Sequence, residues 1–427
     1  MHRPDETTVI IAGKLFDPYS LNLVENQLIT VSNESGLILG VSPYTGNDTS
    51  NPGDTIGANV IDLRHLTVLP GFVDTHVHFF LHPYAETSWS DQLTKEPLVE
   101  RTIRAAVHAK RTLMAGFTAV RDLGTEGAGD ADIALRKCLS GRDALIPGPR
   151  YFCVTRAIVS TGSYGPKGSL HVNKEGIDRI TGAEVADGRE ECLKAVRRQI
   201  GAGADWIKIY ADYRPRFRIA GVSPKAASEA MSIFNYEELK IMIDTAHQYG
   251  VKVAAHATSK DAIKQLLSLS VDTIEHGYDM ASVDAPLRDH ELLRTLAQSN
   301  TKWVPTLAVF FTNRRTGGET WEHAVRSFKA ALAGGIENLA CGGDTGVFAH
   351  GDNALELSLM VQLGADWRKV LRWATLGGWE CVRGFAADII ATSGDLEADF
   401  DGAITAASIK FVMKGGKVFK RDGVSLV

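Results

Sequence analysis

The stretch PGFVDTHVHF, residues 70–79, starts as an apolar run rich in β-formers and ends with His76 and His78. Because side chains alternate along a strand, residues two apart point to the same face. Two imidazoles on one face at a strand's end are the first part of a metal site if further ligands follow downstream. The stretch therefore predicts a buried strand whose end contributes to a site.

Similar strands recur through the middle of the chain, with amphipathic segments between several of them. Seven more strand-like runs follow the first, at 117–124, 150–155, 205–211, 251–257, 272–277, 302–307 and 339–346. The amphipathic segments are 97–116, 190–203, 235–250, 260–270 and 288–299. Strand and helix alternating eight times predict an α/β fold, a (β/α)8 TIM barrel of about 250 residues.

The two ends of the chain have a different pattern. Residues 8–18, 26–43 and 58–70 are short β-rich runs, and 409–423 reads as a hairpin around Gly415 and Gly416. We expect both ends to form one small β-domain, a β-sandwich made of residues 1–66 and 388–427. The barrel would then span residues 67–387.

Metal-binding residue types stand at or near the ends of five predicted strands. In a barrel, these ends converge on one mouth. Neutral imidazoles and a carboxylate are typical zinc ligands. A lysine fits beside metal ions if it is neutral, or if CO2 converts its amine to a carbamate that bridges two metals. The six residues are His76, His78, Lys208, His256, His276 and Asp344.

Composition sets limits on the class of protein. The 427 residues are 44% hydrophobic and 23% charged, with a net charge of −5, which is ordinary for a globular protein. The absence of a Lys/Arg stripe argues against nucleic acid as a partner, and no apolar run reaches the ~18 residues of a membrane span. Five scattered cysteines without a Cys-x-x-Cys pair favour a cytoplasmic location.

The motifs resemble the amidohydrolase superfamily over nearly the whole chain. GFVDTHVHF resembles its first-strand His-x-His signature, and GGDTG (342–346), AHGDNALELSLMVQLG (349–364) and LRWATLGGWECVRG (371–384) resemble its strand-eight and C-terminal pattern. GADWIKIYADYR (203–214) with Lys208 resembles the branch in which a carboxylated lysine bridges two zinc ions. Within that branch, the chain is similar to prolidase-like and ochratoxinase-like amidohydrolases.

The resemblance implies a role for each candidate. His76, His78 and Asp344 would hold one Zn2+, His256 and His276 the other, and a carboxylated Lys208 would bridge them. Metal-bound hydroxide would attack the carbonyl of an amide or peptide bond, and Asp344 would pass the proton to the leaving nitrogen. The substrate would be a small molecule: an N-acyl amino acid, a dipeptide or an ochratoxin-like amide, cleaved in carboxypeptidase-like fashion. A homo-oligomer is also implied.

The chain departs from these relatives after the third strand. They carry a Gly-Gly-His-Gly-like turn, whereas STGSYGPKG (160–168) has Tyr164 at the position of that histidine. Tyr164 would act on the substrate as a neutral hydroxyl donor, or it packs on the loop. Four further residues near strand ends are candidates for substrate contact, with loop packing as the alternative: Tyr210, Tyr213, Arg214 and His350.

Other functions on the same scaffold remain open from the sequence. One is a mononuclear cyclic-amide hydrolase or deaminase resembling imidazolonepropionase, and another is a decarboxylase or lactonase. A non-catalytic relative would have lost ligands, whereas all six candidates are present. Metal content distinguishes the first alternative, because a mononuclear enzyme would bind one zinc ion and leave Lys208 unmodified.

Overall fold

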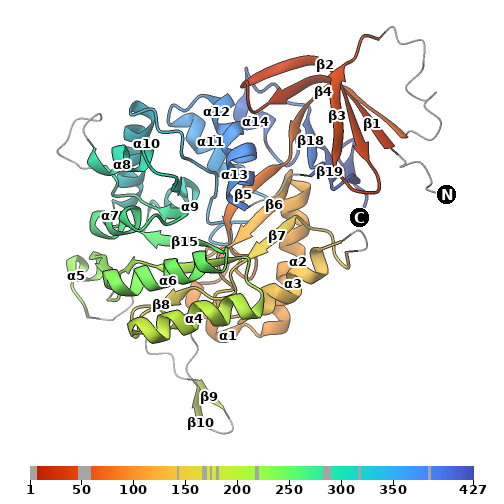
Figure 1. The fold of residues 1–427 in the computed structure, drawn as a ribbon. Helices are drawn as coiled ribbons and strands as arrows, with labels where there is room; N and C mark the ends of the chain where they lie inside the picture. The colour runs from red at the N-terminus through yellow and green to blue at the C-terminus, as the bar shows by residue number, and fades with distance from the viewer. Residues whose placement is uncertain are drawn as a thin grey trace.

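The structure is a computed structural model that describes residues 7–46, 59–141, 144–165, 171–173, 176–178, 182–216, 221–281, 290–315, 319–382 and 386–427. Figure 1 shows an α/β body with a separate sheet at one end, where the last strands of the chain lie beside the first. Alternating strands and helices are confirmed in the body. No helix in the described ranges is both long and apolar enough to cross a membrane.

The terminal sheet joins strands from both ends of the chain. Its order is β21-β20-β19-β18-β4-β1-β2-β3. The strands are β1 (Thr7–Asp17), β2 (Asn22–Ser32), β3 (Ile38–Pro43), β4 (Asn59–Pro70), β18 (Ile389–Thr392), β19 (Ile409–Lys414), β20 (Lys417–Arg421) and β21 (Val424–Ser425). β18 pairs antiparallel with β4, and the predicted hairpin around Gly415 and Gly416 connects β19 to β20. Strands from both ends of the chain thus lie in one sheet, and residue 66, the predicted boundary, lies inside β4.

The body contains two parallel sheets. β5 (Phe72–Val77), β6 (Phe117–Asp122) and β7 (Arg150–Cys153) form one, and the order β11-β8-β12-β15-β16-β17 gives the other. The strands of the second are β8 (Ile158–Val159), β11 (Glu184–Val185), β12 (Trp206–Tyr210), β15 (Lys252–Ala257), β16 (Thr273–His276) and β17 (Lys302–Val304). Two short antiparallel pairs, β9 (His171–Asn173) with β10 (Gly176–Asp178) and β13 (Asp212–Tyr213) with β14 (Met231–Ser232), lie outside these sheets.

Backbone hydrogen bonds link the two parallel sheets at both sides. The Asp205 N–H donates to the Cys153 carbonyl (2.8 Å), which connects the end of β7 to the start of β12. On the other side, Trp303 of β17 and Thr75 of β5 both bond to the segment 338–345. Thr75 N–H donates to Cys341 O (2.9 Å) and Ala340 N–H to Trp303 O (3.1 Å). Together with the pairing inside each sheet, these hydrogen bonds connect β5 through the strands of both sheets and back to β5.

The eighth predicted strand forms only isolated bridges, Trp303 with Leu339 and Val77 with Thr345. Gly342 lies so close to its neighbours that an added Cβ would stand 2.8 Å from the His76 nitrogen. Asp344 then takes a left-handed conformation (φ 62°). The close approach and the turn interrupt the strand just where Asp344 enters the site.

Helices alternate with the strands along the chain, and several of them pack against strands of the body. The helices are α1 (Trp89–Lys95), α2 (Leu98–Met114), α3 (Ala131–Leu139), α4 (Gly188–Ala202), α5 (Pro224–Ser228), α6 (Tyr236–Gln248), α7 (Lys260–Ser268), α8 (Glu291–Ala297), α9 (Leu307–Thr312), α10 (Thr320–Ala333), α11 (Leu355–Gln362), α12 (Trp367–Arg372), α13 (Gly378–Val382) and α14 (Phe400–Ala403). A π-helical turn, Trp373–Gly377, joins α12 to α13. All five predicted amphipathic segments contain a helix: α2, α4, α6, α7 and α8.

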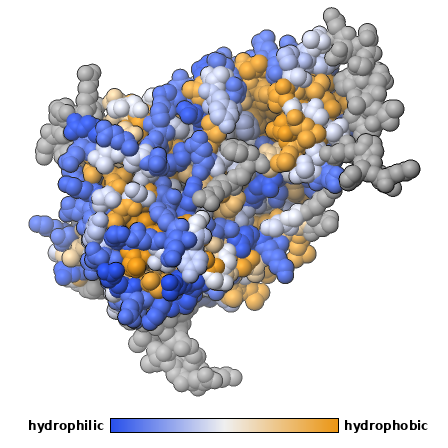
Figure 2. Space-filling model, viewed as in Figure 1, coloured by the Kyte–Doolittle hydropathy of each residue, from blue (hydrophilic) through white to orange (hydrophobic). Residues whose placement is uncertain are grey.

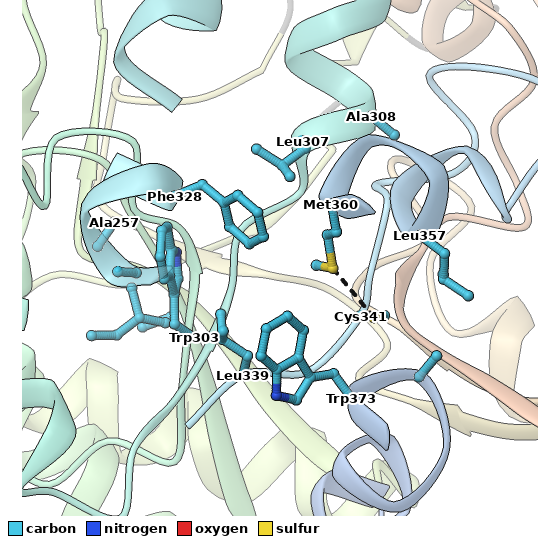
Figure 3. Packing of buried hydrophobic residues seen from close by; sticks show 14 of the residues in the cluster. Ala257, Trp303, Leu307, Ala308, Phe328, Leu339, Cys341, Leu357, Met360 and Trp373 are labelled. Atoms are coloured by element: carbon cyan, nitrogen blue, oxygen red, sulfur yellow. Dashed lines mark hydrogen bonds between the residues drawn. The ribbon is translucent and has the colours of Figure 1, made fainter. Parts of the chain in front are cut away.

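Large apolar side chains fill the space between these layers. Figure 3 shows Trp303 and Trp373 packed with Phe328, Leu339 and Met360 between strands and helices. Cys341 Sγ lies 3.6 Å from the Met360 sulfur, and all five cysteines are free, as their scattered positions predicted. Burial of this size is the main contribution to stability.

The terminal sheet leaves apolar side chains at its outer edge. Figure 2 shows hydrophobic atoms gathered over this part of the molecule. Leu39 and Val41 of the edge strand β3 are 57% and 50% exposed.

Candidate metal centre

The six predicted ligands lie together at the carboxyl ends of the parallel strands. His76 is in β5, Lys208 in β12, His256 in β15 and His276 at the end of β16. His78 follows β5 directly. Asp344 reaches the same place because its backbone N–H donates to the carbonyl of His76 (2.9 Å).

The imidazole rings are close to one another. Ring centroids are 5.5 Å apart for His76 and His78, 5.0 Å for His76 and His276, and 4.5 Å for His256 and His276. Asp344 Oδ1 lies 3.3 Å from His78 Nε2 and 3.7 Å from His76 Nε2. One ligand atom each of His76, His276 and Asp344 lies within 4.8 Å of the other two, a spacing that suits a metal ion.

Hydrogen bonds decide which imidazole nitrogen each histidine can offer. His76 Nδ1 bonds to Glu275 Oε2 (2.7 Å), and His78 Nδ1 donates to the Gly124 carbonyl (2.8 Å). His276 Nδ1 lies 2.9 Å from the Thr306 hydroxyl. These bonds leave Nε2 of each ring for a ligand, and such partners fix the orientation of metal-binding histidines.

His256 and Lys208 each have a buried polar atom without a hydrogen-bond partner among the described residues. These atoms are His256 Nδ1 and Lys208 Nζ. Leaving such atoms unpaired in an apolar interior costs free energy. Unpaired donor atoms at the centre of a histidine cluster fit coordination of a metal, or modification of the amine, better than they fit a purely structural role.

Burial sets the charge of most of these groups. Burial lowers the pKa of His76 to about 4 and of His276 to about 3, and it lowers that of His256 well below its usual value. Burial also lowers the pKa of Lys208 to about 8. Three imidazoles are therefore neutral at pH 7, as ligands must be, and about a tenth of Lys208 is free amine at that pH.

Asp344 and His78 form the charged pair of the site. Burial would raise the pKa of Asp344. At the low pH where Asp344 titrates, however, the charge of the protonated His76 and the hydrogen bond from His78 outweigh burial and hold that pKa well below its usual range. For His78, burial opposes the charge, yet Asp344 raises its pKa to about 9. The carboxylate of Asp344 thus stays ionised.

Two residues that the sequence reading missed support the site from within the ring of strands. Glu275 and Arg121 are fully buried, and Arg121 Nη2 donates to Glu275 Oε1 (2.7 Å). Arg121 also donates to the Thr75 carbonyl (2.7 Å) and lies over Trp206. Glu275 therefore contacts Arg121 with one carboxylate oxygen and His76 with the other. The sequence did hold a signal for this pair: Arg121 and Glu275 stand inside two apolar strands, and a buried charge needs a partner of opposite charge.

Backbone strain gathers at the same place. His276, Thr306 and Asp344 have φ values of 71°, 50° and 62°, in the left-handed region that non-glycine residues rarely adopt. Such conformations persist where the surrounding structure enforces them, and they cluster at functional sites.

The tyrosines predicted as catalytic or substrate-binding form one aromatic group beside His256. Tyr210 stacks on the His256 ring, with centroids 4.4 Å apart and planes at 19°. Tyr164 lies 5.0 Å from both Tyr210 and Tyr213. The Tyr164 hydroxyl donates to Glu126 Oε2, a partner that the sequence reading did not find.

The last two substrate candidates are Arg214 and His350. Burial raises the pKa of Tyr278, and Arg214 is close enough to oppose that shift with its charge. His350 is buried, with its Nε2 3.0 Å from the Leu81 carbonyl. It stacks on His108 at 4.2 Å. The structure does not bring His350 together with the aromatic group.

Buried imidazoles, a lysine and a carboxylate at the ends of parallel strands are the donor set of a metal-dependent enzyme. Residues 67–419 match the Amidohydrolase family, and the chain belongs to that family. It is therefore an enzyme that acts on amide or peptide bonds, as the His-x-His and GGDTG motifs predicted.

Individual relatives agree with this placement. The chain is 24% identical to the ochratoxinase of Aspergillus niger over 455 aligned residues, which cover 98% of this chain and 88% of the relative. A solved structure of a Xaa-Pro dipeptidase with methionine in its active site is 28% identical, with a TM-score of 0.78 over 97% of this chain and all of that one. The solved A. niger ochratoxinase superposes with a TM-score of 0.79 at 24% identity, covering 99% of this chain and 98% of its own. The resemblance to prolidase-like and ochratoxinase-like amidohydrolases is confirmed.

Proposed function

We propose that the protein is a zinc-dependent hydrolase with two zinc ions per chain, cleaving the amide or peptide bond of an N-acyl amino acid, a dipeptide or an ochratoxin-like amide. The observation that carries the proposal is the pair of orphaned buried atoms, Lys208 Nζ and His256 Nδ1, inside a cluster of three further imidazoles and Asp344. The strand ring that holds them is, in this proposal, a closed (β/α)8 barrel.

The residues fit two metal ions if Lys208 is carboxylated. His76, His78 and Asp344 would hold one ion, His256 and His276 the other, and the carbamate of Lys208 would bridge them. Burial lowers the pKa of Lys208 to about 8, which favours this modification because CO2 reacts with the free amine. When bound, such a pair of cations activates water and polarises a carbonyl group.

The chain's own residues then handle the proton. Asp344 Oδ1 is the acceptor, 3.3 Å from His78 Nε2 and in a side chain that is 13% exposed. Because its pKa is held low, Asp344 keeps an accepted proton only briefly. The leaving nitrogen is a far stronger base, so the proton moves on to it.

Tyr164 has a different role from the hydroxyl donor expected at first. Its hydroxyl proton is already donated to Glu126. A phenol has one proton, so in this proposal Tyr164 meets a substrate with its aromatic ring. We therefore assign Tyr164 to substrate binding and leave carbonyl polarisation to the metal site.

One geometric observation favours a second candidate. Among the residues that the structure describes, the ligand atoms of His76, His276 and Asp344 lie within 4.8 Å of one another, a spacing that suits a single ion. A mononuclear enzyme acting on a cyclic amide, or a deaminase, would need only one ion. In that case Lys208 would be dispensable for metal binding.

A paired assay separates these candidates. Hydrolysis is measured with N-acyl amino acids, dipeptides, an ochratoxin-type amide and cyclic ureides, for the wild type and for Lys208→Ala. Lys194→Ala on the outside of α4, whose side chain is 60% exposed, is the matched control. The binuclear proposal expects hydrolysis of a linear amide by the wild type and the control, and its loss with Lys208→Ala. Full activity of Lys208→Ala, or turnover of cyclic ureides alone, would contradict it.

A further inference from the structure

Glu126 is an acidic residue of the site that neither the motifs nor the proposed chemistry uses. It follows β6 in the loop after Asp122, is only 3% exposed and has a left-handed backbone (φ 50°). A buried carboxylate in a strained loop at the carboxyl end of a strand is costly unless the surroundings need it.

Only one oxygen of this carboxylate is used by the surrounding side chains. Trp89 Nε1 donates to Glu126 Oε2 at 2.9 Å, and the Tyr164 hydroxyl donates to the same oxygen. Within the described part of the chain, Oε1 accepts no hydrogen bond. The two bonds on Oε2 fix the direction of the carboxylate and leave Oε1 as a free acceptor.

Arg101 is a buried cation close enough to Glu126 to feel its charge, but it does not pair directly with the carboxylate. Arg101 Nη2 donates to the backbone carbonyls of Thr125 (2.9 Å) and Glu126 (2.8 Å), and its Nε to the carbonyl of Phe80. Among the described residues, no Lys, Arg or His nitrogen forms an ion pair with the Glu126 carboxylate. Its negative charge is therefore not taken up by a direct ion pair, although it favours the charged forms of His78 and Lys208 through space.

Aromatic rings lead from this carboxylate to the metal centre. Tyr164 contacts Trp89 at 5.5 Å between centroids, and Tyr210 and Tyr213 at 5.0 Å each. Tyr210 in turn stacks on His256. The negative charge, the acceptor Oε1 and the ring faces all attract a cation.

We propose that Glu126, held by Trp89 and Tyr164, is a specificity-determining residue that binds a positively charged nitrogen of the substrate. This inference rests on the proposed amide hydrolysis and narrows its substrate class. It favours amides that carry an ammonium group near the scissile carbonyl, such as peptides with a free amino terminus, over neutral N-acyl amino acids and aryl amides.

Glycyl-L-leucine and N-acetyl-L-leucine provide a matched test, because their acyl halves differ only by the ammonium group. The same pair on proline and on phenylalanine covers other leaving residues. We expect the wild type to favour the glycyl member in kcat/KM. A charge-assisted hydrogen bond predicts that Glu126→Gln loses about 10- to 100-fold on the glycyl member and little on the acetyl member.

Two further variants make the test specific. Glu100→Gln, which makes the same chemical change on the outside of α2, should leave both substrates unaffected. Trp89→Phe keeps a ring but removes the donor to Oε2, so it should cause a smaller loss in the same direction. It also serves as the test if Glu126→Gln fails to fold, which its thermal unfolding would reveal.

Nα-acetyl-L-lysine tests which half of the substrate carries the ammonium group that Glu126 binds, because its ammonium group lies on the leaving half. If Glu126→Gln lost activity selectively on Nα-acetyl-L-lysine and not on glycyl-L-leucine, Glu126 would still be the cation-binding residue. The ammonium group that it binds would then lie on the leaving half of the substrate. Equal losses on charged and neutral substrates, or none, would overturn the inference and leave amide hydrolysis standing. Hydrolysis of none of the probes would overturn the proposed function and this inference with it.

Discussion

The buried contact between Glu275, Arg121 and His76 gives the sharpest prediction about the support of the site. We consider Glu275→Gln, which keeps the size of the side chain and removes its charge. Glu275 Oε1 accepts from Arg121 Nη2 and Oε2 bonds to His76 Nδ1, each at 2.7 Å. A glutamine can satisfy only one of these partners with its carbonyl oxygen, and its NH2 group must then face the other donor.

The magnitude follows from the burial. Both side chains of the Arg121 pair are 0% exposed, and removing one partner of such a pair costs about 3–5 kcal/mol. For a chain of 427 residues, the expected fall in Tm is roughly 3–6 °C. Loss of the carboxylate on His76 Nδ1 should also weaken metal binding by about 10- to 100-fold.

Thermal unfolding and a zinc titration of chelator-treated protein measure the two effects. Glu380→Gln is the control, because its carboxylate is 46% exposed and pairs with Lys302 at the surface, where an ion pair contributes at most about 1 kcal/mol. If Glu275→Gln matched the wild type in both Tm and zinc affinity, the reasoning about this buried contact would be refuted.

Two other variants probe a buried acid and a supporting hydroxyl. Burial raises the pKa of Glu356 from 4.5 to about 8, so its stabilising contribution is complete below pH 4.5 and is lost as the pH rises to about 8. Glu356→Gln should therefore reduce the drop in Tm between those two pH values, and an unchanged drop would contradict the assignment. Thr306→Val removes the hydroxyl 2.9 Å from His276 Nδ1 while keeping the β-branch, so we expect about 10-fold weaker zinc binding with little change in Tm. Equal zinc affinity in a titration would show that the hydroxyl does not orient His276.

Much of the candidate site could be predicted because its residues occupy equivalent positions in a repeated pattern. His76, Lys208, His256 and His276 each stand near the end of an apolar run, and the strand ends meet in the structure. The position of each residue within its own apolar run was sufficient to predict that its side chain belongs to the site. The eighth run was predicted less well, since Gly342 and the left-handed Asp344 replace strand geometry by a close contact with β5.

The supporting residues could not be predicted in the same way because their partners are distant in sequence. Arg121 and Glu275 are separated by 154 residues, and Tyr164 lies 38 residues from Glu126. Such pairs depend on which strands and loops become neighbours. The partner of the Tyr164 hydroxyl depends on the same information, and our proposal that Tyr164 acts in substrate binding rests on its contact with Glu126.

The central claim is that Lys208 becomes a ligand between two zinc ions. The most direct measurement is elemental analysis of the purified enzyme, combined with 13C NMR after reconstitution with zinc and 13C-labelled bicarbonate. We predict two zinc ions per chain and a carbamate carbon signal that is absent from Lys208→Ala. One zinc ion per chain and no carbamate signal in the wild type would contradict the account.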